Sequence, residues 1–141
     1  MEVTQIAEVS LTYTDLETVD FGAGGQIYGS LEGSVSGDRL SGSLRLTNLA
    51  ARRPDDVNVP TLRGILTTED GAAVWVELDG IATLRRSDEA RVFVTSFRMR
   101  SGDERYSWVN TTFAVLEGVL DTVAVGGVAR GRVHECAASI S

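Results

Sequence analysis

The feature that most constrains the fold of this chain is an alternation of apolar and polar residues with a period of two. It is clear near the N-terminus, where Val9, Leu11 and Tyr13 are separated by single polar residues. This spacing places the apolar side chains on one face of a β-strand, because successive side chains of a strand point to opposite faces. We expect a strand over residues 3–13, followed by a connection over residues 15–25, where Ala-Gly-Gly interrupts any regular element.

Two hairpins follow in the sequence. For residues 26–48, a two-residue Gly37-Asp38 turn would make Leu31 face Leu44 and Gly33 face Gly42, with the apolar residues on one face. For residues 61–84, a three-residue Glu69-Asp70-Gly71 loop with Gly71 in the left-handed conformation would align the strands. That register makes the following pairs face each other: Leu62 and Leu78, Gly64 and Val76, Leu66 and Val74, Ile65 and Trp75, and Arg63 and Glu77, the last as an ion pair.

The longest connection is Leu49–Pro60, which carries Arg52, Arg53, Asp55 and Asp56. It has two interpretations. It is either a solvated surface loop with self-paired charges or a lid over the mouth of a cavity.

The later part of the chain also has the pattern of strands. We expect strands over residues 91–100, 109–120 and 122–134, and between the first two only a single helical turn or an irregular crossing at residues 102–108. About eight to ten strands at hairpin spacing, with little or no helix, indicate an all-β protein. Glycines inside strands and apolar residues on both faces favour a single antiparallel β-barrel over an open sandwich, and we assign residues 1–141 to one domain.

Composition excludes several classes of function. The formal net charge is −7 and every fixed cation is an arginine, so a basic face for nucleic acid is not expected. No apolar run is long enough to cross a bilayer, and the N-terminal residues do not resemble a signal peptide. With one cysteine the chain cannot form an internal disulfide, and we expect a cytoplasmic protein. His134 and Cys136 are too few ligands for structural zinc, and we expect neither a metal nor a cofactor.

The densest group of hydrogen-bonding and stacking residues lies in residues 93–110. One interpretation is a ligand-binding site. Arginine pairs with anionic oxygens, aromatic rings offer flat apolar walls, and an amide both donates and accepts hydrogen bonds. The alternative is a structural corner in which Asp103 caps the turn and Trp108 plugs one end of the barrel. The candidate ligand-binding residues are Arg98, Arg100, Tyr106, Trp108 and Asn110, together with Arg52 and Arg53 on the long loop.

The same stretch resembles a bacterial family, domain of unknown function 3237. The resemblance rests on Gly102, Asp103, Tyr106, Trp108 and Asn110, with Val109 in place of a leucine. Further similar positions are Glu69-Asp70-Gly71-Ala72, Gly29 and Gly33, and Asn48, Arg52, Arg53, Pro60, Arg63 and Gly64. It covers about residues 26–134 and implies a β-barrel without implying a reaction.

Three functions fit these observations. The first is a barrel that binds a small, partly apolar or aromatic compound through an anionic oxygen. The second is an enzyme on the same barrel, an isomerase, cyclase or hydrolase of an aromatic or polyketide-like metabolite, with Arg98 stabilising an oxyanion and Tyr106 or a buried acid moving protons. The third is a packed barrel with a structural or oligomerisation role, and the sequence allows a homodimer in each case.

Overall fold

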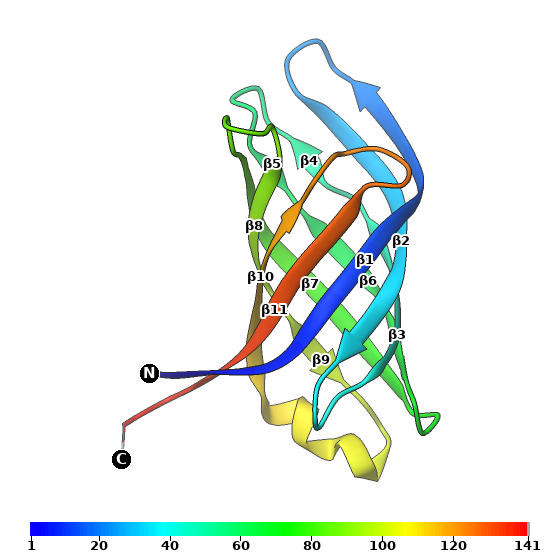
Figure 1. Ribbon diagram of the computed structural model, residues 1–141, viewed down its shortest axis with the longest axis vertical. Coiled ribbons are helices and arrows are strands. Elements are labelled where there is room, and N and C mark those ends of the chain that lie inside the picture. Colours follow the sequence, from blue (N-terminus) through cyan, green and yellow to red (C-terminus); the bar gives the residue numbers. More distant parts are fainter. Residues whose placement is uncertain (141) are drawn as a thin grey trace.

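Eight long antiparallel strands close into a barrel in the computed structural model, which describes residues 1–140 (Figure 1). Strand β1 pairs with both β2 and β11, and β7 pairs with both β6 and β8, so the ring of strands returns to its start. The predicted all-β barrel is therefore confirmed. The elements are β1 (Glu2–Asp20), β2 (Gly25–Ser36), β3 (Gly42–Asn48), β4 (Ala51–Arg52), β5 (Asn58–Val59), β6 (Thr61–Thr68), β7 (Ala73–Leu84), β8 (Arg91–Ser96), β9 (Arg98–Arg100), the 3₁₀ helix η1 (Glu104–Thr111), β10 (Phe113–Leu120) and β11 (Val128–Ala137).

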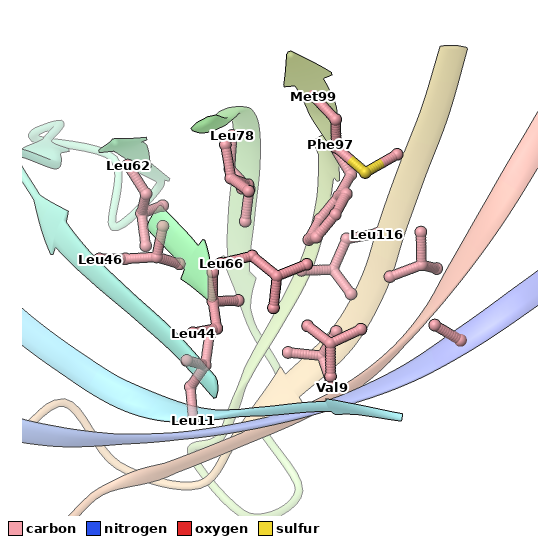
Figure 2. Packing of buried hydrophobic residues seen from close by; sticks show 14 of the residues in the cluster. Val9, Leu11, Leu44, Leu46, Leu62, Leu66, Leu78, Phe97, Met99 and Leu116 are labelled. Carbon is pink, nitrogen blue, oxygen red and sulfur yellow. The ribbon is translucent and has the colours of Figure 1, made fainter. Parts of the chain in front are cut away.

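The core fills the interior of the barrel with the apolar residues of the alternating strands. Figure 2 shows Leu44, Leu66, Phe97 and Leu116 pointing inward from different strands. The side chains of Leu66 and Phe97 are fully buried. The period-two pattern therefore predicted the inward face correctly, because in a closed barrel only the interior face of each strand is shielded from water.

The second predicted hairpin is confirmed in detail. Ile65 pairs with Trp75 and Arg63 with Glu77 across β6 and β7. Gly71 has φ +88°, the left-handed conformation that the three-residue loop requires and that glycine adopts without a steric penalty. The predicted Arg63–Glu77 ion pair is present at 3.8 Å, and Arg63 makes a closer one to Asp79 at 3.0 Å.

The register predicted for the first hairpin is wrong by two residues. Leu31 pairs with Leu46 and Gly33 with Leu44, where the two-residue turn placed Leu44 and Gly42. The turn is longer because Leu40 folds into the core, with 1% of its surface exposed. The Ser41 hydroxyl closes this longer turn, since it donates to the Gly37 carbonyl at 2.7 Å and accepts from the Gly37 N–H. A shift of two residues keeps each side chain on its face, so the inward residues were still identified.

Strand boundaries differ from the predictions in three places. The connection predicted over residues 15–25 is wrong for its first half, because β1 continues to Asp20 and stays paired with β2 after a bulge near Thr14. The predicted long loop contains β4 and β5, which pair with each other. Strands β10 and β11 begin later than predicted, because η1 occupies residues 104–111 and a loop occupies residues 121–127.

The two ends of the barrel are different. Helix η1 crosses one end, which we call the closed end (Figure 1). Strands β4 and β5, the 85–90 turn and the 121–127 loop lie toward the other end, which we call the open end. No helix among the described residues is long and apolar enough to cross a membrane.

Candidate functional site

An interior cavity of about 70 Å³ lies toward the open end of the barrel. Its volume exceeds the roughly 10–15 Å³ of such space that admits one water molecule. It is well below the roughly 300 Å³ at which pockets for whole small molecules begin. The interior therefore has room for one end of a ligand. The lining residues are mostly apolar: Leu11, Tyr13, Ile27, Leu31, Asn48, Ala50, Asn58, Pro60, Leu62, Leu78, Ala82, Arg91, Phe93, Thr95, Leu116, Leu120, Val123 and Ala129.

A tyrosine and an asparagine form a buried hydrogen bond on the cavity wall. Asn48 Nδ2 donates to the Tyr13 hydroxyl at 2.9 Å, and Asn48 Oδ1 accepts from the Thr61 N–H at 3.3 Å. The amide is thereby oriented by the backbone of β6. Burial raises the pKa of the Tyr13 phenol above its ordinary value, and the bond from Asn48 opposes this in part. The phenol is therefore neutral at physiological pH.

The Tyr13 proton is left available. Its oxygen accepts from Asn48, and no described residue accepts a hydrogen bond from its O–H. A phenol both donates and accepts, so its proton is free to meet an acceptor in the cavity.

Two residues that line the same cavity carry buried polar atoms without partners. Within residues 1–140, Asn58 Oδ1 and Thr95 Oγ1 make no hydrogen bond, although the two residues are only 6% and 3% exposed. An unpaired buried polar group costs about 1–3 kcal/mol, so native proteins rarely keep one without a function, a water or a ligand. The residues around the cavity thus combine apolar side chains with three polar groups, those of Tyr13, Asn58 and Thr95, that have an unused donor or acceptor.

Arg91 is the one charged residue among the described residues that line this cavity. Its guanidinium donates to the backbone carbonyl of Asp56, in the turn between β4 and β5. Asp56 has φ +65°, a conformation that non-glycine residues seldom adopt. The contact ties this turn to the first residue of β8. On the other side, the 121–127 loop is fixed to β1, because the Gly126 N–H donates to the Tyr13 carbonyl at 2.8 Å.

The aromatic and amide residues predicted as a site lie at the closed end instead. The Tyr106 hydroxyl donates to Asp70 Oδ1 at 2.8 Å, and the Trp108 ring stacks under the Arg39 guanidinium at 3.9 Å. Both groups of the Asn110 amide pair with the Ser101 backbone, at 2.8 and 2.9 Å.

The charged groups around Tyr106 reinforce the same corner. The bonds from Thr68 and Tyr106 hold the pKa of Asp70 below its ordinary value, and the Tyr106 pKa is raised in return. Arg105 lowers the pKa of Asp103 in the same way. Asp103 also caps η1 through the Arg105 N–H, as expected of the structural corner.

The predicted arginines lie on the outer surface. Arg98 and Arg100 are exposed on β9 and border a surface hollow with Trp75, Asn110 and Phe113. Arg52 lies 3.9 Å from Asp20, and Arg53 forms a 2.5 Å ion pair with Asp55. None of these arginines lines the interior cavity. Phe97 and Met99 point inward, and successive side chains of a strand point to opposite faces, so residues 98 and 100 point outward.

Five residues of the cavity were not predicted from the sequence: Tyr13, Asn48, Asn58, Thr95 and Arg91. A signal existed for three of them. Tyr13, Asn48 and Thr95 occupy inward positions of alternating strands, and Asn48 and Thr95 are polar where the pattern requires apolar residues. Polar residues at inward positions near one end of a barrel are informative, because burial of an unpaired polar group is unfavourable. Asn58 and Arg91 gave no such signal, since both follow turns.

Comparison with known proteins identifies the fold and no more. No family model and no curated protein matches the chain. A conserved protein of unknown function from Rhodopseudomonas palustris has a TM-score of 0.80 at 19% identity, over 95% of this chain and 96% of that one. A β-barrel-like protein from Acinetobacter baumannii has a TM-score of 0.79 at 16% identity, over 95% and 94%. An enzyme from Penicillium herquei has a TM-score of 0.69 at 17% identity, over 94% and 93%.

Proposed function

We propose that the protein binds a small, partly apolar or aromatic molecule with an anionic oxygen, at the open end of the barrel. The observation that carries the proposal is that three residues lining an otherwise apolar cavity, Tyr13, Asn58 and Thr95, have polar groups with an unused donor or acceptor. Ligand sites in proteins have this composition, with apolar walls and a few convergent polar groups. This is the class of ligand expected from the sequence. We assign its anionic oxygen to Arg91, because the arginines predicted from the sequence lie on the outer surface.

The size of the cavity limits how the ligand sits. Because the cavity is about 70 Å³, an end group of the ligand occupies it, and the rest extends toward the open end, where Arg91 lies. At the closed end, η1 crosses the barrel and the side chains of Phe97 and Val109 are fully buried, so we place the ligand at the open end.

A substitution that fills the cavity tests the proposal. Ala82→Leu adds bulk to the cavity wall, and Ala73→Leu adds the same bulk on the outward face of the same strand. In a thermal-shift screen of small carboxylates and phenols, compounds that raise the melting temperature of the wild type should fail with Ala82→Leu and succeed with Ala73→Leu. Equal shifts with both variants would place binding outside the cavity. A screen without any hit would favour the packed, structural barrel.

An enzyme is the second candidate, because the buried Tyr13 phenol keeps a proton that no described residue accepts. A neutral phenol oriented by Asn48 can act as a general acid toward a bound oxygen or carbon. Recovery of a hit compound unchanged after long incubation would argue for binding alone. Conversion that is lost in Tyr13→Phe and kept in Tyr28→Phe, an exposed tyrosine on β2, would argue for catalysis.

Three expectations from the sequence stay proposals. We retain the relation to domain of unknown function 3237, on the Gly102, Asp103, Tyr106, Trp108 and Asn110 pattern. We also retain a cytoplasmic location and a homodimer, and the mass of the protein in solution tests the latter.

A further inference from the structure

We propose that the ligand is an unbranched hydroxy acid, whose hydroxyl group enters the cavity and whose carboxylate stays at the mouth beside Arg91. This inference rests on the proposed function and narrows the class of ligand. It follows from what each polar group of the cavity can still donate or accept.

The unpaired groups inside the cavity fit a hydroxyl. Tyr13 has a proton to donate, Asn58 Oδ1 can only accept, and the Thr95 hydroxyl can do either. A ligand group that meets both Tyr13 and Asn58 must both accept and donate, which a hydroxyl does with one oxygen. A carbonyl or ether would leave Asn58 Oδ1 unpaired, and an ammonium would leave the Tyr13 proton without an acceptor.

A carboxylate does not fit inside the cavity. Of the described lining residues only Arg91 is charged, so an anion among Tyr13, Asn58 and Thr95 would lose its hydration without a countercharge close by. At Arg91 the situation is different, because the present partner of its guanidinium is the neutral carbonyl of Asp56. A carboxylate is a stronger partner, since it forms charge-assisted and bidentate bonds with arginine.

The segment between the two oxygens should be a narrow aliphatic chain. The walls between the polar groups are apolar and include Leu62, Leu78 and Leu120. The cavity of about 70 Å³ is less than half of the roughly 150 Å³ cavity that admits benzene, so an aromatic ring does not fit without movement of the walls. A methylene chain fits the narrower space and buries its apolar surface there.

The test uses three matched series of probes from four to eight carbons: ω-hydroxy acids, the acids without the hydroxyl, and the alcohols without the carboxylate. Binding is measured by isothermal titration calorimetry with the full chain. We expect one length of hydroxy acid to bind at least about tenfold more tightly than its matched acid, because the acid leaves buried polar groups unpaired.

Two variants, each with a matched control, test which protein groups bind the hydroxyl and carboxylate ends of the probe. Thr95→Val should reduce the preference for the hydroxy acid, whereas Thr83→Val, on the outward face of β7, should keep it in full. Arg91→Gln should weaken hydroxy-acid binding by about tenfold and leave the alcohols unchanged, whereas Arg86→Gln, in the exposed turn, should change neither. Circular dichroism checks that each variant is folded.

The outcomes separate this inference from the proposed function. If acids and hydroxy acids bind equally and Ala82→Leu abolishes both, the hydroxyl assignment is wrong and the cavity is still a ligand site. If hydroxy acids bind but Arg91→Gln has no effect, the orientation is wrong. If no probe of any length binds to the wild type, the hydroxy-acid class is overturned. The broader screen described above then decides whether the cavity binds another class of compound or only water.

Discussion

The two ends of the barrel use polar residues in opposite ways. At the closed end, Tyr106 pairs with Asp70, and Asn110 pairs with the Ser101 backbone. At the open end, Thr95 and Asn58 are buried without a partner among the described residues. A dense polar cluster whose members satisfy one another stabilises a corner of the fold. A few buried groups left unsatisfied mark the place where something else is needed to complete the hydrogen bonds.

The largest expected difference is in the free energy of unfolding, between two phenylalanine variants on the same segment of chain. Phe97→Ala should lower the free energy of unfolding by about 3–5 kcal/mol, because Phe97 is fully buried in the packed closed half. Phe93→Ala, four residues earlier at the cavity wall, should cost clearly less, because Phe93 is only half-buried and already borders empty space. Urea unfolding of both variants measures this. Equal losses would mean that the two halves are packed alike.

The next comparison replaces a buried threonine at each end. Thr68→Val should lower the free energy of unfolding by about 1–3 kcal/mol, because the Thr68 hydroxyl donates to Asp70 at 2.6 Å and accepts from the Ala72 N–H at 2.8 Å. Thr95→Val should be neutral or stabilising without ligand, because its hydroxyl has no partner among residues 1–140. Urea unfolding again decides. A Thr95→Val loss as large as that of Thr68→Val would show that the Thr95 hydroxyl is already satisfied.

A third comparison separates stability from binding. Asn110→Ala should lower the free energy of unfolding by about 1–2 kcal/mol, because it removes two hydrogen bonds to Ser101. It should leave the affinity for any cavity ligand unchanged. Calorimetric titration beside the unfolding curve checks both. Loss of binding with stability intact would restore the predicted site at residues 98–110.

The smallest effect is a difference in proton titration. The pKa values of Tyr13 and Tyr106 both lie above the ordinary 10.0, the first because of burial and the second because of the hydrogen bond to Asp70. In each case the folded state holds its proton more tightly than the unfolded state. The resulting stability is therefore complete below pH 10 and is lost as the pH rises through the folded pKa.

Phenolate absorbance against pH resolves the two tyrosines. Asp70→Asn should move one late transition back toward pH 10, because Tyr106 loses its anionic partner, and should not move the other. Tyr13→Phe should remove the remaining late transition. A titration curve that is unchanged by Tyr13→Phe would contradict the burial of that phenol.

The sequence was sufficient for the fold because the signals that define it are local. The inward face followed from alternation, and the second hairpin followed from the Glu69-Asp70-Gly71 loop. The first hairpin was misplaced because Leu40 turns into the core, which depends on contacts across the barrel end rather than on the turn itself. Likewise, β1 extends to Asp20 because its pairing with β2 continues past the body of the barrel.

The site was much harder to predict, since residues far apart in the sequence form it. Tyr13, Asn48 and Thr95 come from three strands, and nothing local to any of them shows that they share a cavity. Arg98 and Arg100 were more conspicuous because they are close in sequence, yet their spacing puts both on the outer face. Counting polar residues at inward positions would have been the better guide.

The most direct test of the account is a nuclear magnetic resonance titration of the labelled protein with the best-binding hydroxy acid. It compares the two ends of the barrel in one measurement. Binding at the open end predicts that the backbone amides of Tyr13, Asn58, Arg91 and Thr95 shift and saturate together, while those of residues 98–110 do not respond. Saturable shifts confined to residues 98–110 would contradict it and place the ligand at the closed end.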